Sequence, residues 1–419
     1  MSTLSQLAET LIGSEIVKLG NAINERIRQG EKIYNYTIGD FDPAIFPIPA
    51  ELKQGIHDAY EAGYTNYPPG DGIPELKAAV AGFIKEYQGV EYGMDEVLIA
   101  SGGRPLIYSL FKTLVDPGDK VIYAVPSWNN NHYVHMNGGE HCCIQALPEN
   151  DFMPLAEDIA PCLSGAVLLC LCTPQNPTGT TLAPEAMERI CDLVLEENRR
   201  RGPEARKLFV MFDQMYGLLT YGAVEHHNPV AVRPEMKEYT VFIDGISKSL
   251  SATGVRVGWT LGPARIVAKM KALLSHIGAW APMAEQHAVA GFLQQKEAVD
   301  KYLETFRQGL EERLRLIYDG IVVLRDKGYP VDAIPPQAAI YLTIRIDLAG
   351  RQQGDQLLAT QEDVTAYLLA EAKLAVVPFY AFGAARDSPW YRLSVGTANT
   401  ADIPEMLQRL ESALQQLNA

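Results

Sequence analysis

One lysine, Lys248, lies among small residues directly after an apolar run. The stretch DGISKSLSATGVRVG (residues 244–258) follows the run TVFI, and it also carries Ser247 and Arg256. A lysine that is buried near other cations has a lowered pKa and becomes a nucleophile at neutral pH. A hydroxyl and a guanidinium beside it suit a phosphate group. The stretch therefore predicts a lysine nucleophile beside an anion site, whereas a lysine with no such neighbours is usually a solvated surface charge.

Two more apolar runs end on polar groups. VLLCLC leads into TPQNPTG, which contains Asn176, and KLFVMF leads into DQMY, which contains Asp213 and Tyr216. In open parallel sheets, ligands bind outside the carboxyl ends of the strands, so we expect these side chains to meet Lys248 there. Taken singly, Asn176 is a turn signal and Asp213 a helix N-cap, and the prediction depends on their conjunction.

An amine, an acid, a phenol and an amide together suit pyridoxal 5'-phosphate. Lysine forms an imine with its aldehyde. Carboxylate opposite the ring nitrogen keeps that nitrogen protonated, which makes the ring an electron sink. Phenol and amide groups hydrogen-bond the ring oxygen. We therefore predict Lys248, Asp213 and Tyr216 as catalytic residues and Asn176 as a cofactor ligand.

The sequence also offers a cradle for the cofactor phosphate. SGGRP (residues 101–105) follows an apolar run and opens a predicted helix, so Gly103 and Arg104 present backbone N–H groups at a helix N-terminus. Trp128, after the next run, is placed to stack on the pyridine face, with an ordinary core tryptophan as the alternative.

The elements that position these residues alternate between short apolar runs and stretches of helical period. That rhythm predicts an α/β fold with a mostly parallel sheet covered by helices. A long helix is expected over residues 297–327. The predicted strands of the larger unit are Glu96–Ala100, Lys120–Ala124, Ala166–Cys172, Lys207–Phe212, Glu238–Ile243 and Val255–Leu261. The predicted strands of the smaller α+β unit are Ile340–Ile346, Leu374–Pro378 and Tyr391–Val395.

Eight motifs occur in one order along the chain. They are TIGDFDP, YTNYPPGDGIPELKAAV, IASGGRPLIYSLFKTLVDPGD, VPSW, TPQNPTG, VMFDQMY, DGISKSLSATGVRVG and YRLSVG. With them the chain resembles the class I/II aminotransferases of fold type I, the aspartate aminotransferase superfamily, over nearly its whole length. The resemblance implies a seven-stranded sheet in a large cofactor domain (47–295). It also implies an N-terminal arm that is part of the small domain (1–46) and a small C-terminal domain (296–419).

The same resemblance implies roles for individual residues. Arg392 is similar to the arginine that grips the substrate α-carboxylate, and Gly39 to the backbone group beside it. Tyr67 is similar to the tyrosine that reaches the phosphate across a dimer interface, so a homodimer with shared active sites is implied. The residues similar to the family's cofactor site are Gly103, Arg104, Trp128, Asn176, Asp213, Tyr216, Ser247, Lys248 and Arg256.

The chain departs from the family pattern in four places. Gln214 stands where glutamate usually follows the aspartate, and Asp244 stands where asparagine is common. Ser127 replaces an aromatic residue, and residues 129–132 form an unusual Asn-Asn-Asn-His run. None of these changes removes a group that imine chemistry needs.

Composition excludes several other classes of function. The 419 residues are 47% hydrophobic and carry a formal net charge of −15, which argues against a nucleic-acid partner. We expect no membrane segment and a cytoplasmic location, because no leader or long apolar run is visible. The six cysteines are expected to be reduced and structural. His132, His135 and the pair at 226–227 lack a third ligand at useful spacing, so no metal is predicted.

Transamination between an L-amino acid and a 2-oxo acid is the predicted activity. A β-lyase on the same fold is the alternative enzyme, and a DNA-binding regulator with an aminotransferase-like domain is the non-enzymatic one. The substrate side chain stays open. Arg104 offers a cation for a distal acid, whereas Trp128 and Trp280 offer an apolar pocket.

Overall fold

A seven-stranded sheet forms the centre of the larger unit in the computed structural model, which describes residues 3–13 and 15–417. The strand order is β2-β8-β7-β6-β5-β3-β4, and β8 is antiparallel to both of its neighbours. The other adjacent pairs are parallel, so the sheet is mostly parallel, as predicted. The strands are β2 (Val97–Ala100), β3 (Lys120–Val125), β4 (Glu140–Gln145), β5 (Ala166–Cys172), β6 (Phe209–Asp213), β7 (Thr240–Gly245) and β8 (Gly258–Leu261).

All six predicted strands of this sheet are present, with β8 beginning three residues later than predicted, at Gly258. The seventh strand, β4, has no match among the predicted apolar runs. It lies at the edge of the sheet, and Ile144 is its one buried residue. An edge strand with a solvated face needs no continuous apolar run, so its sequence EHCCIQ gives little signal.

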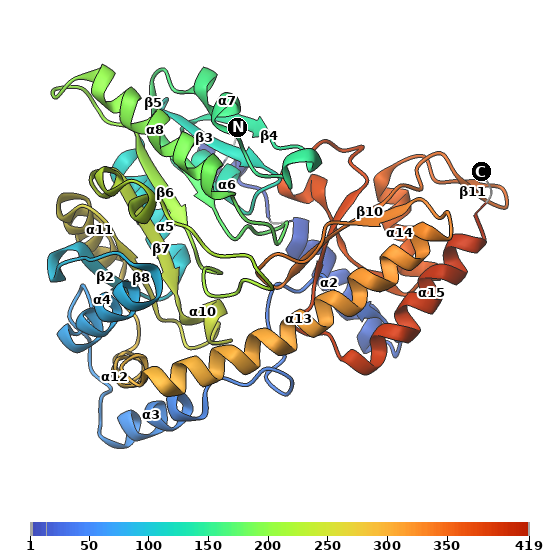
Figure 1. Cartoon of the computed structure of the whole chain (residues 1–419), viewed down its shortest axis with the longest axis horizontal. Helices are drawn as coiled ribbons and strands as arrows, with labels where there is room; N and C mark the ends of the chain where they lie inside the picture. Colours follow the sequence, from blue (N-terminus) through green and yellow to red (C-terminus); the bar gives the residue numbers. More distant parts are fainter. Residues whose placement is uncertain (1–2, 14, 418–419) are drawn as a thin grey trace.

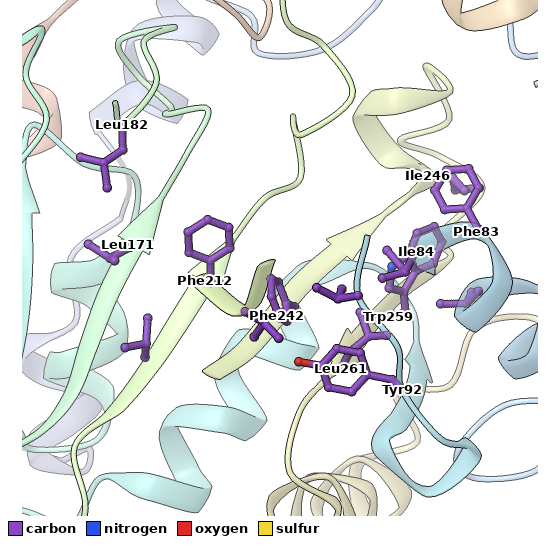
Figure 2. Packing of buried hydrophobic residues seen from close by; sticks show 14 of the residues in the cluster. Phe83, Ile84, Tyr92, Leu171, Leu182, Phe212, Phe242, Ile246, Trp259 and Leu261 are labelled. Carbon is purple, nitrogen blue, oxygen red and sulfur yellow. The ribbon is translucent and has the colours of Figure 1, made fainter. Parts of the chain in front are cut away.

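Helices cover both faces of the sheet. On one face lie α5 (Gly103–Leu114), α6 (Asn130–Met136) and α11 (Ala264–Ile277), and on the other lie α4 (Pro74–Gln88), α8 (Pro184–Arg201) and α12 (Met283–Leu293). Successive side chains of a strand point to opposite faces. Phe212 and Phe242 therefore pack with Trp259 in one core (Figure 2), whereas Met211 and Ile243 face the core beneath α5.

The C-terminal part of the chain forms a second, smaller sheet of order β14-β15-β10-β9. Its strands are β9 (Val331–Ala333), β10 (Tyr341–Ile346), β14 (Val377–Pro378) and β15 (Trp390–Ser394). The N-terminal segment reaches this part of the molecule because β1 (Tyr34–Asn35) pairs with β13 (Leu374–Ala375). The predicted long helix is present as α13 (Lys296–Asp326), which runs from the larger unit to the smaller one (Figure 1).

The remaining α-helices and strands complete the two units. They are α1 (Gln6–Thr10), α2 (Glu15–Arg28), α3 (Ala50–Glu61), α7 (Ala156–Ile159), α9 (Pro229–Val232), α10 (Ile246–Ser249), α14 (Gln361–Glu371), α15 (Ile403–Gln415) and the two-residue strands β11 (Gln352–Gln353) and β12 (Gln356–Leu357). Within the described ranges, no helix combines the length and the apolar character needed to cross a bilayer.

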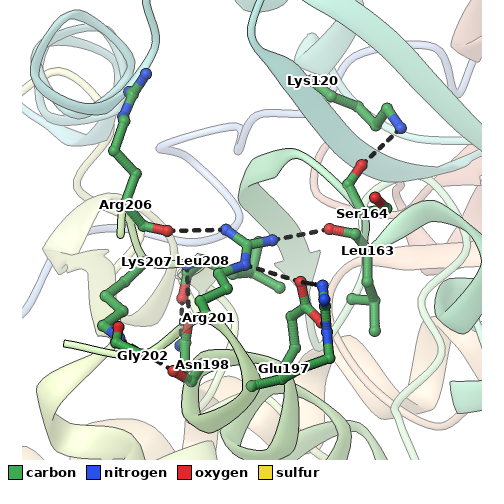
Figure 3. Close-up of polar contacts among 11 residues, drawn as sticks. Lys120, Leu163, Ser164, Glu197, Asn198, Arg201, Gly202, Arg206, Lys207 and Leu208 are labelled. Carbon is green, nitrogen blue, oxygen red and sulfur yellow. Dashed lines mark hydrogen bonds and ion pairs between the residues drawn. The ribbon is translucent and has the colours of Figure 1, made fainter. Parts of the chain in front are cut away.

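Polar contacts fasten the end of α8 to the rest of the larger unit (Figure 3). Arg201 pairs with Glu197 at 2.8 Å, and it also donates a hydrogen bond of 2.8 Å to the carbonyl of Leu163. The ammonium of Lys207 donates to the carbonyl of Asn198 at 3.0 Å. Because both charged groups of the Glu197–Arg201 pair are largely buried, losing Glu197 would leave Arg201 as a buried charge without a carboxylate partner, whereas Glu197 also pairs with Arg200 at 2.8 Å.

The expectation that all cysteines are reduced is wrong for two of the six. Cys142 in β4 and Cys162 form a disulfide, because the edge strand and the segment before β5 lie side by side. Cys143, Cys170, Cys172 and Cys191 are free.

Candidate active site

A cavity of about 390 Å³ opens at the carboxyl ends of β5, β6 and β7. Apart from Tyr67 and Trp280, it brings together every residue that the sequence predicted for the site. These residues are Gly39, Gly103, Arg104, Trp128, Asn176, Asp213, Tyr216, Ser247, Lys248, Arg256 and Arg392. They come from both units, since Asp213 lies in β6 of the larger sheet and Arg392 lies in β15 of the smaller one.

Lys248 lies in the short helix α10, which begins directly after β7. Its ammonium donates a hydrogen bond to the carbonyl oxygen of Gly39. The pKa of Lys248 is lowered to about 8, chiefly by burial and also by Arg392, Arg104 and Arg256, while Asp40 opposes the shift. A lysine with this pKa is roughly one-fifth neutral near physiological pH, a far larger neutral fraction than that of a solvated lysine, and the neutral amine is the nucleophile.

Asp213 is the last residue of β6, and strand alternation directs its side chain to the same face of the sheet as Met211. Burial raises the pKa of Asp213 to about 6, and a hydrogen bond of 3.1 Å from the backbone N–H of Met215 opposes that rise. No lysine or arginine forms an ion pair with this carboxylate in the part of the chain that the structure describes. The carboxylate is therefore available to a cationic group of a ligand.

Tyr216 shares a hydrogen bond with a residue that the sequence did not single out. The hydroxyl of Tyr341, in β10, lies 2.6 Å from the hydroxyl of Tyr216. Burial raises the pKa of both phenols, so both are protonated at neutral pH. Because the two residues are 125 positions apart, no local signal could pair them. The apolar run at β10 predicted a strand. It did not indicate that Tyr341, the first residue of that strand, would lie in the site.

Arg392 lies in β15 at the base of the cavity and is 2% exposed. It donates to the side-chain oxygen of Asn176 at 3.0 Å and to the carbonyl of Thr37 at 2.6 Å. The rings of Tyr341 and Phe382 lie 4.7 and 4.9 Å from the guanidinium carbon. Its Nε has no partner among the described residues, which leaves a buried donor for an anionic ligand.

A second cationic corner is formed by Arg256, Ser247 and the N-terminus of α5. Arg256 donates to the carbonyls of Thr253 at 2.6 Å and Ser101 at 2.8 Å. Gly102 precedes α5 with φ +90°, and a Cβ there would lie 2.2 Å from Nη2 of Arg256. Only glycine permits this backbone and this close approach. The free N–H groups of the helix and the guanidinium fit a phosphate group.

The NPTG turn contacts the smaller unit directly. Gly179 has φ +70°, and a Cβ there would lie 2.1 Å from the carbonyl oxygen of Tyr341. The hydroxyl of Thr343 donates to the carbonyl of Thr178 at 2.7 Å. The turn signal at residues 176–179 is thus also the contact that brings Asn176 to Arg392 across the two units.

Arg104 and Trp128 face each other in the cavity wall. The guanidinium carbon of Arg104 lies 4.6 Å from the centroid of the Trp128 ring. No carboxylate or carbonyl of the described residues accepts a hydrogen bond from this guanidinium. Arg104 is therefore held over an aromatic face with its donors free for a ligand.

Tyr67 and Trp280 lie outside the cavity of this chain. Tyr67 is 82% exposed, and its ring centroid is 5.2 Å from that of Trp280. Trp280 does not line the cavity of this chain and packs beside Tyr67, and its role in an apolar substrate pocket stays a prediction. The role of Tyr67 across a dimer interface stays a prediction.

Another unpredicted residue of the site is Asp40. Its carboxylate accepts a hydrogen bond of 2.7 Å from the hydroxyl of Thr253 and favours the charged form of Lys248. Asp40 belongs to the motif TIGDFDP, and its position directly after Gly39 is the sequence feature that could have identified it. Among the described residues, no group of three His, Cys, Asp or Glu side chains is arranged to hold a metal ion.

Comparisons with known proteins agree with this site. Residues 32–410 match the family model of aminotransferase class I and II. The chain belongs to this family. It is 30% identical over 404 residues to the aspartate aminotransferase of Geobacillus stearothermophilus, and the match covers 95% of this chain and 94% of the relative.

Solved aminotransferase structures have the same fold. The aspartate aminotransferase of Rhizobium meliloti superposes with a TM-score of 0.89 at 25% identity, over the whole of both chains. The Thermus thermophilus enzyme with maleate superposes with a TM-score of 0.86 at 27% identity, over 99% of this chain and 100% of that one. The predicted fold and the predicted activity are thereby confirmed, and the chain is a pyridoxal-phosphate-dependent aminotransferase.

Proposed function

We propose that pyridoxal phosphate occupies the cavity between Lys248 and Asp213. Arg256, Ser247 and the N–H groups of Gly103 and Arg104 would hold its phosphate, and Trp128 would pack against its ring. The observation that carries this proposal is the pairing of a buried amine with a pKa near 8 and a buried carboxylate without a cationic partner in one cavity. When bound, the cofactor supplies an aldehyde for a covalent bond and a ring that accepts an electron pair.

The protein residues then divide the work of transamination. Arg392 binds the substrate α-carboxylate in a two-pronged pair, which orients the Cα–H bond. Lys248 would take the proton from that carbon as general base and hold it on Nζ, from which it can act as general acid. Asp213 keeps the ring nitrogen protonated, while Tyr216 and Asn176 hydrogen-bond the ring oxygen. The low exposure of Arg392 and Tyr216 keeps water from this part of the cavity.

We further propose a dicarboxylic amino acid and its oxo acid as the substrates. Arg104 supports this class because its guanidinium lies in the cavity wall with its donors unpaired among the described residues. A carboxylate at the far end of the substrate would fit between Arg104 and the Asn129–Asn130 segment. The aspartate aminotransferases reported above favour the same class.

A half-reaction screen with the twenty amino acids tests the substrate class. Loss of the cofactor absorbance should be fastest with aspartate or glutamate. In Arg104→Gln, kcat/KM for these substrates should fall by roughly 10- to 100-fold, the scale of losing a hydrogen bond to a charged group. Reactivity with alanine should change little and serves as the matched control. Equal losses for alanine and aspartate would contradict a distal-carboxylate role.

Three further predictions stay proposals. A homodimer would bring Tyr67 of one subunit to the phosphate of the other. Domain boundaries at residues 46/47 and 295/296 and a cytoplasmic location also remain predictions. The β-lyase alternative is separated by a turnover assay without an oxo acid, in which a lyase continues to form product and an aminotransferase stops after its first half-reaction.

A further inference from the structure

A cluster of buried polar side chains lies behind the sheet, on the face opposite the cavity. It consists of Gln88 at the end of α4, Gln214 directly after β6, Asp244 in β7 and His226, and we call it the Gln214 cluster. Ile243 packs on the α5 face, so the next residue, Asp244, points to the other face. Gln214 is 0% exposed and Asp244 5% exposed. The proposed reaction uses none of these side chains.

The carboxylate of Asp244 accepts hydrogen bonds from both amides. Its Oδ2 accepts from Nε2 of Gln88 at 3.1 Å and from Nε2 of Gln214 at 3.2 Å. Its Oδ1 accepts from the backbone N–H of Gly245 at 2.7 Å. Gln214 also donates to Oε1 of Gln88, while its own Oε1 lies 3.1 Å from Nε2 of His226. Since an amide oxygen only accepts, His226 carries its proton on Nε2.

The cluster holds a single acid. Burial lowers the pKa of His226 to about 3, so this imidazole is neutral. Burial raises the pKa of Asp244 to about 7, opposed by the three donors around it. No lysine or arginine pairs with Asp244 within the described residues. A second carboxylate here would have to stay protonated or repel the first, because two like charges at one buried site disfavour ionisation.

The cluster is connected to both residues that flank the proposed cofactor. Gln214 follows Asp213, and its backbone N–H donates to the carbonyl of Ile243 at 3.0 Å. Asp244 lies four residues before Lys248 and fixes Gly245, the residue at which the chain leaves β7 for α10. A shift of either side chain is therefore transmitted to the ends of β6 and β7.

We propose that Gln214 and Asp244 are positioning residues, an acid–amide pair that fixes the spacing of Asp213 and Lys248. The pair needs one acid and one amide, and the two can exchange places. In the family pattern that the chain resembles, glutamate and asparagine stand at these two positions, which would be the exchanged form of the pair. The proposal rests on the assignment of Lys248 and Asp213 to the cofactor.

A charge-exchange cycle tests the pair. The four proteins are the wild type, Gln214→Glu, Asp244→Asn and the double variant, each as apoprotein and as cofactor-loaded enzyme. Gln214→Glu places two acids together, and Asp244→Asn turns an amide group toward two amide donors. Each single variant should lower kcat/KM by roughly tenfold, within the coupling range of one hydrogen-bond network. The double variant should return to within about threefold of the wild type.

Two further readouts separate positioning from general loss of stability. The pKa of the Lys248–cofactor linkage, read from its absorbance, should shift in each single variant and return in the double one. Urea unfolding of the apoproteins should show the same rescue without cofactor. Gln286→Glu is the matched control, because Gln286 is a buried amide that is hydrogen-bonded to Ile73 and Ala281 and does not line the cavity. It should lower the free energy of unfolding and leave the linkage pKa unchanged.

The outcomes are distinguishable. If losses in the two single variants multiply in the double variant, or if the single variants behave as wild type, the pair does not act as proposed. If Gln214→Glu does not fold, the proposal requires that the double variant folds, and a double variant that also fails to fold overturns it. If the wild type itself forms no linkage at Lys248, the proposed cofactor site fails instead.

Discussion

The hydroxyl group of Tyr341 lies 2.6 Å from that of Tyr216, and the ring of Tyr341 also lies 4.7 Å from the guanidinium carbon of Arg392. One residue of the smaller unit thus contacts the phenol that is proposed to hydrogen-bond the cofactor and the arginine that is proposed to bind the substrate. A change at Tyr341 should therefore affect both the cofactor contact of Tyr216 and the substrate binding of Arg392.

Tyr341→Phe removes the hydrogen bond to Tyr216 and keeps the ring under Arg392. We expect kcat/KM to fall by about 2- to 12-fold, which corresponds to about 0.5–1.5 kcal/mol for one neutral hydrogen bond. The pKa of the Lys248–cofactor linkage should move as well, because Tyr216 loses its partner. Tyr367→Phe is the control. Its hydroxyl donates to the carbonyl of Ala413 away from the cavity, so stability should fall and kcat/KM should not.

The lowered pKa of Lys248 predicts how cofactor attachment depends on pH. Below pH 8 the side chain is an ammonium, so the attachment rate of pyridoxal phosphate to the apoprotein should rise about tenfold per pH unit. Above pH 8 the amine is already neutral and the rate should level off. Stopped-flow absorbance measures this profile. A rate that continues to rise toward pH 10 would indicate an ordinary, solvated lysine.

Asp213→Ala should separate cofactor binding from turnover. The phosphate contacts and Lys248 remain, so pyridoxal phosphate should still bind, as absorbance and dialysis would measure. Turnover should fall by at least about a hundredfold, the scale of losing one preorganised electrostatic partner. Asp213→Glu keeps the charge and should retain more activity than the alanine variant. Wild-type turnover in Asp213→Ala would exclude the carboxylate as the ring-nitrogen partner.

Gly102→Ala should weaken cofactor binding through Arg256. The new Cβ would lie 2.2 Å from Nη2 of Arg256, at a backbone angle of φ +90° that alanine adopts only with strain. The guanidinium must therefore move, and the Kd for pyridoxal phosphate should rise by roughly tenfold. Gly82→Ala is the control. Gly82 lies within α4 with open space around it, and a helical alanine there should be neutral or stabilising.

The residues at strand ends could be predicted because the apolar run of the strand and the polar residue after it are neighbours in the sequence. An apolar run followed by a polar residue places Asp213 at the end of β6, and parallel topology then gathers the ends of β5, β6 and β7. Tyr341 could not be found in this way. Its partner Tyr216 belongs to another unit, and the contact depends on how β10 packs against the NPTG turn.

The edge of the sheet was predicted less well than its centre. β4 exposes most of its side chains, so the hydrophobic pattern that marks a central strand is absent. Because β4 was not predicted, Cys142 and Cys162 were expected to be reduced, although the position of β4 beside the segment before β5 allows their disulfide. Gln214 and Asp244 were visible as departures from the family pattern. Their direct hydrogen bond required the three-dimensional structure.

The most direct test of this account is the site of covalent attachment. Cofactor-loaded protein is reduced with borohydride, digested and mapped by mass spectrometry. We predict a single pyridoxyl adduct on Lys248, and its absence in Lys248→Ala together with loss of turnover. An adduct on another lysine, or turnover that survives Lys248→Ala, would contradict the account.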